Sequence, residues 1–267
     1  GIPTLNEYFD LECAKEIQEK HGKAVVVSAA NVFYHVEDLH SIVAGVKSLL
    51  SHDGVFVMQG SYLPDIIKTR AFDILYHEHL LYYRYETLQE LLDMYDLEVF
   101  HLYRAAVHGG SIVVYAGHKG EHVMDESVES FKREEYLNGY RNYETYARFG
   151  KSIKRLREQI KSLVTSVKSS GSTIYAYGAP AKGTVLLNYC QLTSADIGLA
   201  VEKNSFKIGR FIPGTGIEIC DETKVNEPDY YLMLPWNFLQ EFCQSEKFLS
   251  GDRKFIVPVP YPRILSR

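Results

Sequence analysis

Four consecutive residues, Tyr76, His77, Glu78 and His79, each carry a side chain that can give or take a proton. A histidine titrates near neutral pH, and a neighbouring carboxylate can orient its ring and raise its basicity. All ten histidines of the chain lie within residues 21–122, so any histidine chemistry belongs to the first half of the sequence. General acid–base catalysis is therefore the main interpretation of this run.

Two other interpretations of the run stay open. The spacing of His77 and His79 puts two imidazoles on one side of an extended segment, as in some metal sites, but no third ligand follows at a familiar spacing. A structural role, with both rings bonded to backbone carbonyls, needs no ligand at all. We therefore predict no metal.

Asn31 and His35 come directly after the apolar run 23–30, which predicts a buried parallel strand. Ligands of open α/β sheets bind at the carboxyl ends of such strands, so both side chains are candidates to face a site. The alternative is that Asn31 caps a turn and His35 lies on the surface.

A glycine turn later in the first half, His108-Gly109-Gly110-Ser111, offers backbone N–H groups beside an imidazole. Glycines let a ligand approach the main chain closely. A plain hairpin turn explains the glycines equally well, although it does not explain the histidine.

The second half has a candidate anion site in the turn Gly178-Ala179-Pro180-Ala181-Lys182-Gly183, which follows a predicted strand and opens a helix. Pro180 replaces the middle glycine of a dinucleotide fingerprint, so that assignment is weak. A helix N-terminus with a lysine nevertheless favours phosphate. Glu202 ends the next strand, where an acid often meets a ribose, and Arg210 follows in a polar segment; a solvated loop is the alternative.

The predicted elements alternate between strands and helices in both halves. In the first half we expect an extended start, a helix over 10–21, a strand over 23–30, a helix over 37–50, a turn at 51–54, a strand over 55–59, a helix over 86–95, and strands over 97–103 and 111–116. Residues 126–170 lack proline and predict one long helix or a helical pair. The second half predicts strands over 173–177, 197–201, 230–234 and 254–257, a helix over 181–190, and an extended end at 258–262.

Composition excludes several classes of protein. The chain has 267 residues, of which 46% are apolar and 24% charged, with a net charge of −5 and no dense basic cluster. Nucleic acid and membrane partners are therefore not expected, and no apolar run is long enough to span a bilayer. The four scattered cysteines favour reduced thiols, and the start has no signal-peptide pattern, so we expect a cytoplasmic protein. The sequence does not fix the oligomeric state; a monomer is favoured.

The motifs, taken in order, resemble one family. The set consists of Asn31-Val32-x-x-His35, the run from Phe72-Asp73 to Tyr76-His77-Glu78-His79, the turn His108 to Ser111, the turn Gly178 to Gly183, and Leu234-Pro235-Trp236-Asn237. It is similar to the S-adenosylmethionine-dependent sugar C-methyltransferases, which methylate C3 of TDP-linked 4-keto deoxysugars. The resemblance covers essentially the whole chain.

The resemblance implies a fold of α/β class. Family members have a four-cysteine zinc module, a cofactor-binding α/β domain and a C-terminal α/β domain, with the sugar nucleotide held between the last two. Here the zinc module and the glycine-rich cofactor loop are missing. We expect a partial doubly wound methyltransferase-type domain over 1–120, a long helical segment over 121–170 and a Rossmann-like domain over 171–267, and we expect the substrate in the cleft between the two α/β parts.

The resemblance also implies roles for the candidate residues. His79 is the implied base, Tyr76 and Glu78 orient it or stabilise an enolate, and His35 lies near the C4 oxygen or the cofactor. The implied S-adenosylmethionine contacts are Phe9, Ala30 and Asn31. The implied contacts to a nucleotide-diphosphate sugar are Lys182, Gly178, Ala179, His108, Gly109, Ser111, Glu202 and Arg210. A non-catalytic nucleotide-binding fragment and an NAD-linked enzyme remain the alternatives.

Overall fold

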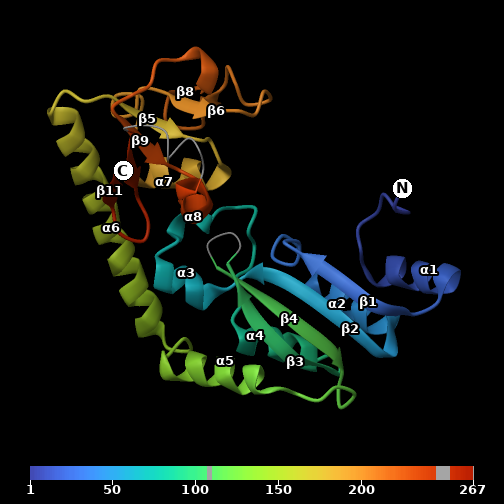
Figure 1. The fold of residues 1–267 in the computed structure, drawn as a ribbon. Coiled ribbons are helices and arrows are strands. Elements are labelled where there is room, and N and C mark those ends of the chain that lie inside the picture. The colour runs from blue at the N-terminus through green and yellow to red at the C-terminus, as the bar shows by residue number, and fades with distance from the viewer. Residues whose placement is uncertain (107–109, 245–252, 267) are drawn as a thin grey trace. The chain divides into compact units, whose positions relative to one another are not determined.

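The computed structural model describes residues 1–106, 110–244 and 253–266. Packing divides the chain into two compact units, which are coloured along the sequence in Figure 1. Unit 1 comprises Gly1–Asp65 and Glu78–Asn142, and unit 2 comprises Ile66–His77 and Tyr143–Arg267. A short stretch of the first half of the sequence therefore belongs to the second unit. The sequence-based boundaries at residues 120 and 170 stay a prediction.

Unit 1 contains a four-stranded mixed sheet in the order β1-β2-β4-β3. β1 (Ala24–Ala30) runs parallel to β2 (Leu50–Ser61), whereas β4 (Ser111–His118) is antiparallel to both β2 and β3 (Leu97–Ala105). The turn expected at residues 51–54 is wrong, because β2 already begins at Leu50. Residues 51–54 lie where the register against β1 shifts, from Ala24 opposite Leu50 to Val26 opposite Val55. A Cβ at Gly54 would lie only 3.0 Å from Ala24 O, so a larger residue would be tight there.

Three helices of unit 1 begin at acidic caps. α1 (Leu11–His21), α2 (Leu39–Leu49) and α5 (Glu126–Leu137) follow Asp10, Asp38 and Asp125, whose carboxylates each accept a backbone N–H of the first turn. Such caps satisfy donors that have no partner inside the helix. α4 (Tyr85–Asp93) lies where a helix was expected, and α3 (Leu63–Thr69), which was not expected, crosses the division between the units.

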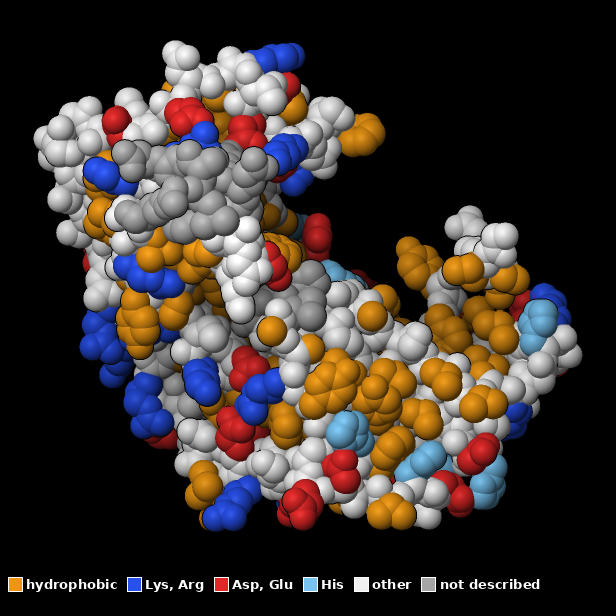
Figure 2. Space-filling view, in the orientation of Figure 1, with side chains coloured by type: hydrophobic (Ala, Val, Ile, Leu, Met, Phe, Trp, Pro, Cys, Tyr) orange, Lys and Arg blue, Asp and Glu red, His pale blue; other side chains and the backbone are white. Residues whose placement is uncertain are grey.

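One face of this sheet is covered and the other is open. Phe56 and Met58 of β2 are buried in the core that α2 and α4 help to form. Val26 of β1 lies in register with Val55, one residue before Phe56, so it points to the opposite face, and it is 59% exposed. Figure 2 shows hydrophobic side chains lying together on the surface in the region of this sheet.

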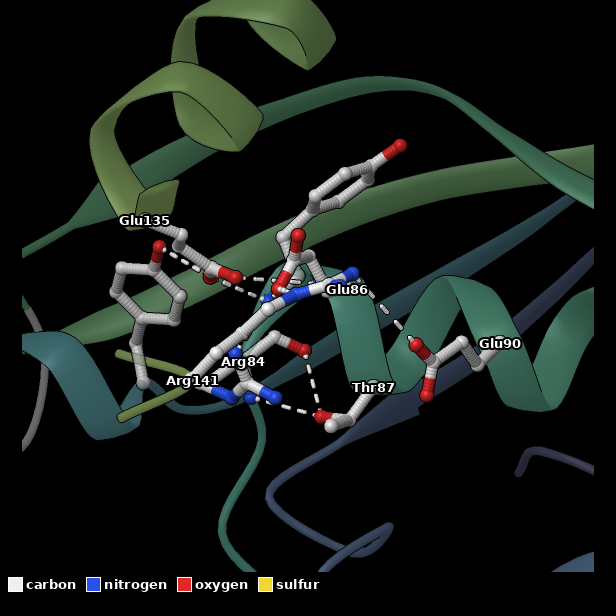
Figure 3. Close-up of polar contacts among 8 residues, drawn as sticks. Arg84, Glu86, Thr87, Glu90, Glu135 and Arg141 are labelled. Carbon is white, nitrogen blue, oxygen red and sulfur yellow. Dashed lines mark hydrogen bonds and ion pairs between the residues drawn. The ribbon is translucent and has the colours of Figure 1, made fainter. Parts of the chain in front are cut away.

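A buried carboxylate fastens α4 to α5. Glu135 of α5 is 1% exposed and accepts hydrogen bonds from Tyr62 Oη at 2.7 Å and from the backbone N–H of Tyr85 at 2.6 Å (Figure 3). Burial raises the pKa of this carboxyl group, and the hydrogen bonds oppose that rise. Beside it, Glu86 bonds Arg84 at 2.9 Å and Arg141 at 2.7 Å, which lowers the pKa of Glu86. The N-terminus of α4 is thus held by acids from both helices.

Unit 2 contains a seven-stranded sheet in the order β11-β10-β9-β5-β6-β8-β7. Its five central strands are parallel: β10 (Lys254–Val257), β9 (Tyr230–Met233), β5 (Ile174–Tyr177), β6 (Ala200–Glu202) and β8 (Ile217–Asp221). The edge strands β11 (Arg263–Leu265) and β7 (Phe211–Ile212) are antiparallel to their neighbours. The strand expected over 197–201 is shifted to β6, and β7, β8 and β11 were not expected.

The helices of unit 2 include the long α6 (Tyr143–Ser169), so residues 126–170 form a helical pair rather than one helix. α7 (Ala181–Cys190) has the bounds that the sequence predicts. Short helical segments were not expected: η1 (Phe72–Ile74), η2 (Glu222–Lys224), η3 (Trp236–Phe238) and α8 (Leu239–Cys243). Each follows a polar or proline-containing segment whose own pattern is too short to read. The described residues thus form a mixed α/β structure with two sheets.

Candidate functional site

The carboxyl end of β1 leads into the first group of candidate residues. Asn31 follows the strand directly and has a positive φ of 54°, a conformation that asparagine tolerates better than most residues. Its backbone N–H donates to Gln59 O at 3.0 Å, and its Oδ1 accepts from Tyr34 Oη at 3.0 Å. The turn after β1 is therefore fixed to the neighbouring strand and to its own next residues.

His79 lies in a group of aromatic rings. It is 9% exposed, and its ring lies edge-on to Tyr34, with 4.6 Å between centroids, and edge-on to His35 at 5.0 Å. The backbone joins the same segments, since Leu80 N–H donates to Tyr34 O at 2.9 Å. The structure therefore brings together three predicted residues of unit 1: Asn31, His35 and His79.

The tautomer of His35 follows from its partner. Nδ1 of His35 lies 2.6 Å from the backbone oxygen of Glu78, and a carbonyl can only accept a hydrogen bond. Nδ1 therefore carries the proton, which leaves Nε2 of a neutral ring as the acceptor. This exposed imidazole can take up a proton from a ligand.

The remaining residues of the 76–79 run are placed differently. Glu78 is exposed and meets His35 through its backbone oxygen, while its carboxylate makes no hydrogen bond or ion pair with the residues that the structure describes. Tyr76 is half-buried and belongs to unit 2. The predicted action of Tyr76 and Glu78 on His79 stays a prediction.

The glycine turn is only partly visible, because His108 and Gly109 lie outside the described residues. Ser111 is fully buried at the start of β4. Gly110 has a φ of 129° and packs on Asp65, whose Cβ would lie 2.9 Å from a side chain at this position. Glycine is thus required here by backbone conformation and by packing.

Asp65 belongs to a charged network that the sequence did not reveal. Arg104 Nε donates to Asp65 Oδ1 at 3.0 Å, and its two terminal nitrogens donate to Glu134 at 3.0 and 2.8 Å. The guanidinium also lies over the rings of Tyr62 and Phe131. This network supports the segment next to the glycine turn, and only the contacts in space make it visible.

Unit 2 has a small cavity of about 270 Å³ at the carboxyl ends of β5 and β6. The residues that line it are Tyr177, Gly178, Ala179, Pro180, Val201, Glu202, Lys203, Lys207, Glu222 and Pro235. It therefore contains three of the predicted substrate contacts, Gly178, Ala179 and Glu202. This is the place where ligands of open α/β sheets bind.

Glu202 and Lys207 brace the turn at the cavity. Glu202 accepts the N–H groups of Ala179 at 3.2 Å, Lys203 at 2.8 Å and Asn204 at 3.2 Å. Burial raises the pKa of its carboxyl group, but these N–H donors and Lys207 outweigh burial and hold the pKa below its usual value. Lys207 Nζ donates to Ala179 O at 2.9 Å and lies 3.7 Å from Glu202. No role was predicted for Lys207, which lies within the turn that follows β6.

Lys182 and Arg210 do not line this cavity. Lys182 Nζ donates to Asn237 Oδ1 and lies 4.2 Å from the ring centroid of Trp236. Arg210 is exposed and takes part in a backbone turn with Lys207 at 3.1 Å. Their predicted contacts with a substrate stay predictions.

Three motifs of the sequence meet around Lys182. Trp236 Nε1–H donates to Asp73 Oδ2 at 2.7 Å, and Asp73 is fully buried. Asp73, Trp236 and Asn237 occur within the motifs of the sequence, but no role was predicted for them. An aspartate inside an otherwise apolar segment is the signal that identifies such a position, because unpaired acids are rarely buried.

Two further observations concern membranes and metals. No helix among the residues described is both long and apolar enough to cross a bilayer. Within the same part of the chain, no three side chains of the metal-binding types gather in one place.

Comparison with known proteins gives two matches. Residues 106–260 match the family described as the C-methyltransferase C-terminal domain. The curated C-methyltransferase NovU of Streptomyces niveus is 37% identical over 270 aligned residues, which cover 100% of this chain and 64% of NovU. The chain thus spans less than two thirds of the length of this relative.

Proposed function

Because the chain belongs to the C-methyltransferase family, we propose that it acts in transfer of a methyl group from S-adenosylmethionine to C3 of a nucleotide-linked 4-keto deoxysugar. The observation that carries this proposal is the group of Asn31, His35 and His79, which lies at the carboxyl end of a parallel strand. The activity is proposed for the longer protein in which such a chain occurs, since the relative NovU extends beyond the match.

Proton removal is the step that the histidines explain. A C3–H bond next to a C4 ketone is acidic enough for a positioned base, and the bonding electrons move to the ketone oxygen as the enolate forms. We assign the base to His79, which aromatic rings hold in place. A neutral imidazole has the strength that this transfer needs near pH 7. His35, with Nε2 free of the Glu78 contact, lies where it can bond the developing oxyanion once protonated, or can replace His79 as base.

The residues at the end of β1 suit the cofactor. Ala30 is small and exposed, and Asn31 follows it in a turn that leaves the strand end accessible. Phe9 is half-buried against the core of unit 1. These three residues would hold S-adenosylmethionine, which when bound supplies a sulfonium methyl group to the carbanionic C3.

Unit 2 would bind the nucleotide part of the substrate. The cavity at Gly178–Pro180 lies at the ends of two parallel strands, with Lys203 and Lys207 in its lining. Lysines and a helix N-terminus favour a diphosphate. Lys182 is the second helical residue of α7, so it stands at the end of that helix that attracts anions.

Calorimetry on this chain separates the proposal from its rivals. Thymidine diphosphate should bind and NAD should not. Titration with S-adenosylmethionine tests whether unit 1, residues 1–65 and 78–142, holds the cofactor by itself. Tight NAD binding would favour an NAD-linked enzyme. Binding of thymidine diphosphate without any proton exchange at C3 of the 4-keto sugar in the full-length protein would favour a non-catalytic nucleotide-binding protein.

A further inference from the structure

Asp73 is the most deeply buried acid among the described residues of unit 2. Its side chain is 0% exposed and its Oδ2 accepts the Nε1–H of Trp236 at 2.7 Å. Among the residues described, Oδ1 has no hydrogen-bond partner. A buried carboxylate oxygen without a donor is costly, so this arrangement needs an explanation beyond packing.

Lys182 approaches the same tryptophan from another side. Its ammonium lies 4.2 Å from the ring centroid of Trp236 and donates to Asn237 Oδ1. The indole is thus held at its N–H edge by an acid and on its face by a cation. A cation over an indole face is an attractive contact whose strength grows as water is excluded.

Neighbouring contacts fix the segment that carries Asp73. Phe72 packs on Tyr189 of α7 with 5.1 Å between ring centroids, and Arg70 lies 4.6 Å above the ring of Tyr261. The chain is therefore anchored by two aromatic contacts directly before the aspartate. The backbone cannot easily carry Asp73 away from Trp236.

We propose that Asp73 is a positioning residue for substrate binding by unit 2: it holds the Trp236 indole, and the indole holds the Lys182 ammonium at the start of α7, where that cation meets the diphosphate of the substrate. This inference rests on the proposed function, because it takes a nucleotide diphosphate as the ligand. Asp73 itself does not touch the ligand.

Energetics argue against a purely structural role. An apolar side chain of similar size would fill this site without the cost of burying a charge, and buried ion pairs are often no more stabilising than such replacements. Burial raises the pKa of Asp73 to about 6 and lowers the pKa of Lys182 to about 8, so both groups are mainly charged at pH 7. The attraction between them keeps the lysine charged despite its burial.

The charged and titratable groups around Asp73 are few. Lys182 and the thiol of Cys190, both on α7, face it, together with the indole N–H of Trp236. The thiol is neutral across the pH range of interest, because burial raises its pKa to about 12. Titration between pH 5 and 7 therefore reports on the carboxylate.

The chain provides its own probe, since Trp236 is its single tryptophan. Thymidine diphosphate is titrated into this chain from pH 5 to 7.5, with tryptophan fluorescence and calorimetry as readouts. The variants are Asp73→Asn, which keeps shape and an acceptor but not the charge, and Glu218→Gln, an exposed acid of β8 that serves as control.

The ratio of the dissociation constants of Asp73→Asn and the wild type is the quantity to follow. We expect it to be roughly tenfold at pH 7.5, as for loss of a charge-assisted contact, and close to one at pH 5, where Asp73 of the wild type is protonated. Titration of the diphosphate itself is common to both proteins and cancels in the ratio. Glu218→Gln should match the wild type throughout.

Other results would overturn either the positioning role of Asp73 or the proposed function on which it rests. A ratio near one at every pH, or a ratio that does not change with pH, overturns the positioning role and leaves the proposed function intact. Failure of the wild type to bind thymidine diphosphate overturns the nucleotide-binding part of the proposed function itself. Trp236→Phe, measured by calorimetry, gives a second test: it should also weaken binding roughly tenfold, and unchanged affinity contradicts the role of the indole.

Discussion

The two sheets of this chain end in different ways. In unit 2 the five parallel strands are bordered on both sides by antiparallel strands, β7 and β11. In unit 1 the sheet ends at the parallel strand β1, whose outer edge has no neighbouring strand among the residues described. An open edge is a ready template for further strand pairing. The edges of the unit 2 sheet are thus short strands of two and three residues, whereas unit 1 ends at a seven-residue edge strand that offers more backbone for further pairing.

The two units also differ in their polar side chains. Nine of the ten histidines lie in the segments of unit 1, and unit 2 contains only His77. Unit 2 instead carries the buried acid–indole–lysine group and the cavity at β5 and β6. Under the proposed function, unit 1 would supply the side chains for proton transfer and unit 2 those that hold an anion. Mutations in the two units should then affect kcat and KM separately.

The largest effect is expected in unit 1. His79→Ala in the full-length protein should lower kcat by roughly 10²–10⁴, the range for loss of a positioned general base. It should also slow exchange of the C3 hydrogen with deuterated solvent, which NMR follows without S-adenosylmethionine. The exposed neighbour His77→Ala serves as control and should exchange normally. If His79→Ala keeps full exchange while His35→Ala abolishes it, the base is His35.

A large loss of stability is expected where unit 1 buries an acid. Glu135→Ala leaves Tyr62 Oη and the N-terminus of α4 without their acceptor, and should lower the free energy of unfolding by about 3 kcal/mol. Urea unfolding followed by circular dichroism measures this. Glu129→Ala, an exposed acid on the same helix, is the matched control. Equal stability of the two variants would show that Glu135 is not needed to join the helices.

The acid of unit 2 should instead make stability depend on pH. The pKa of Asp73 is about 6 in the folded chain, above its value of about 4 when unfolded, so the folded state favours the protonated form. Stability is therefore present below pH 4 and is lost as the pH rises through 6, by about 2–3 kcal/mol. Trp236 fluorescence during denaturation reports this unit. Asp73→Asn should lack this loss, and an identical pH dependence in both proteins would contradict the prediction.

A smaller effect should appear in KM. Lys182→Ala should raise KM for the sugar nucleotide by about tenfold with kcat nearly unchanged, because a diphosphate contact is made in ground and transition states alike. Steady-state kinetics of the full-length protein test this against Lys154→Ala, an exposed lysine of α6. A fall in kcat with constant KM would place Lys182 in the chemical step.

The smallest effect is expected on the open face of unit 1. Val26→Thr should change the free energy of unfolding by less than about 0.5 kcal/mol, since Val26 is 59% exposed. The same change at Val201 of β6, which is 2% exposed, should cost about 2 kcal/mol, because it buries a hydroxyl group. Equal costs in urea unfolding would mean that the face of β1 is covered in solution.

Local sequence pattern was sufficient for two elements. The helix over 181–190 and the strand β10 have the predicted bounds, because apolar spacing and flanking turn residues agree there. The turn predicted over residues 51–54 is wrong because Asp53-Gly54 is typical of a turn, whereas here these residues form an irregular part of β2, where the register against β1 shifts. β7 and β11 are two and three residues long, too short for any pattern to identify.

The candidate site was predictable only in part, for a related reason. Asn31 and His35 were found from their position after a strand, and His79 from its motif. The meeting of Asp73 with Trp236, 163 residues later, depends on contacts that no local pattern encodes. The Arg104 network is hidden in the same way, because Asp65 and Glu134 are 39 and 30 residues from the arginine.

The placement of Ile66–His77 in unit 2 also has a consequence for synthesis of the protein on the ribosome. Asp73 emerges long before Trp236 exists, and at roughly 5–20 residues per second the delay is about 10–30 s. During that time unit 1 can gather the strands on both sides of the segment, while the segment itself stays hydrated and its aspartate ionised. While unit 1 folds, residues 66–77 therefore stay outside it as a solvent-exposed loop. They are removed from water only when the last third of the chain has been made.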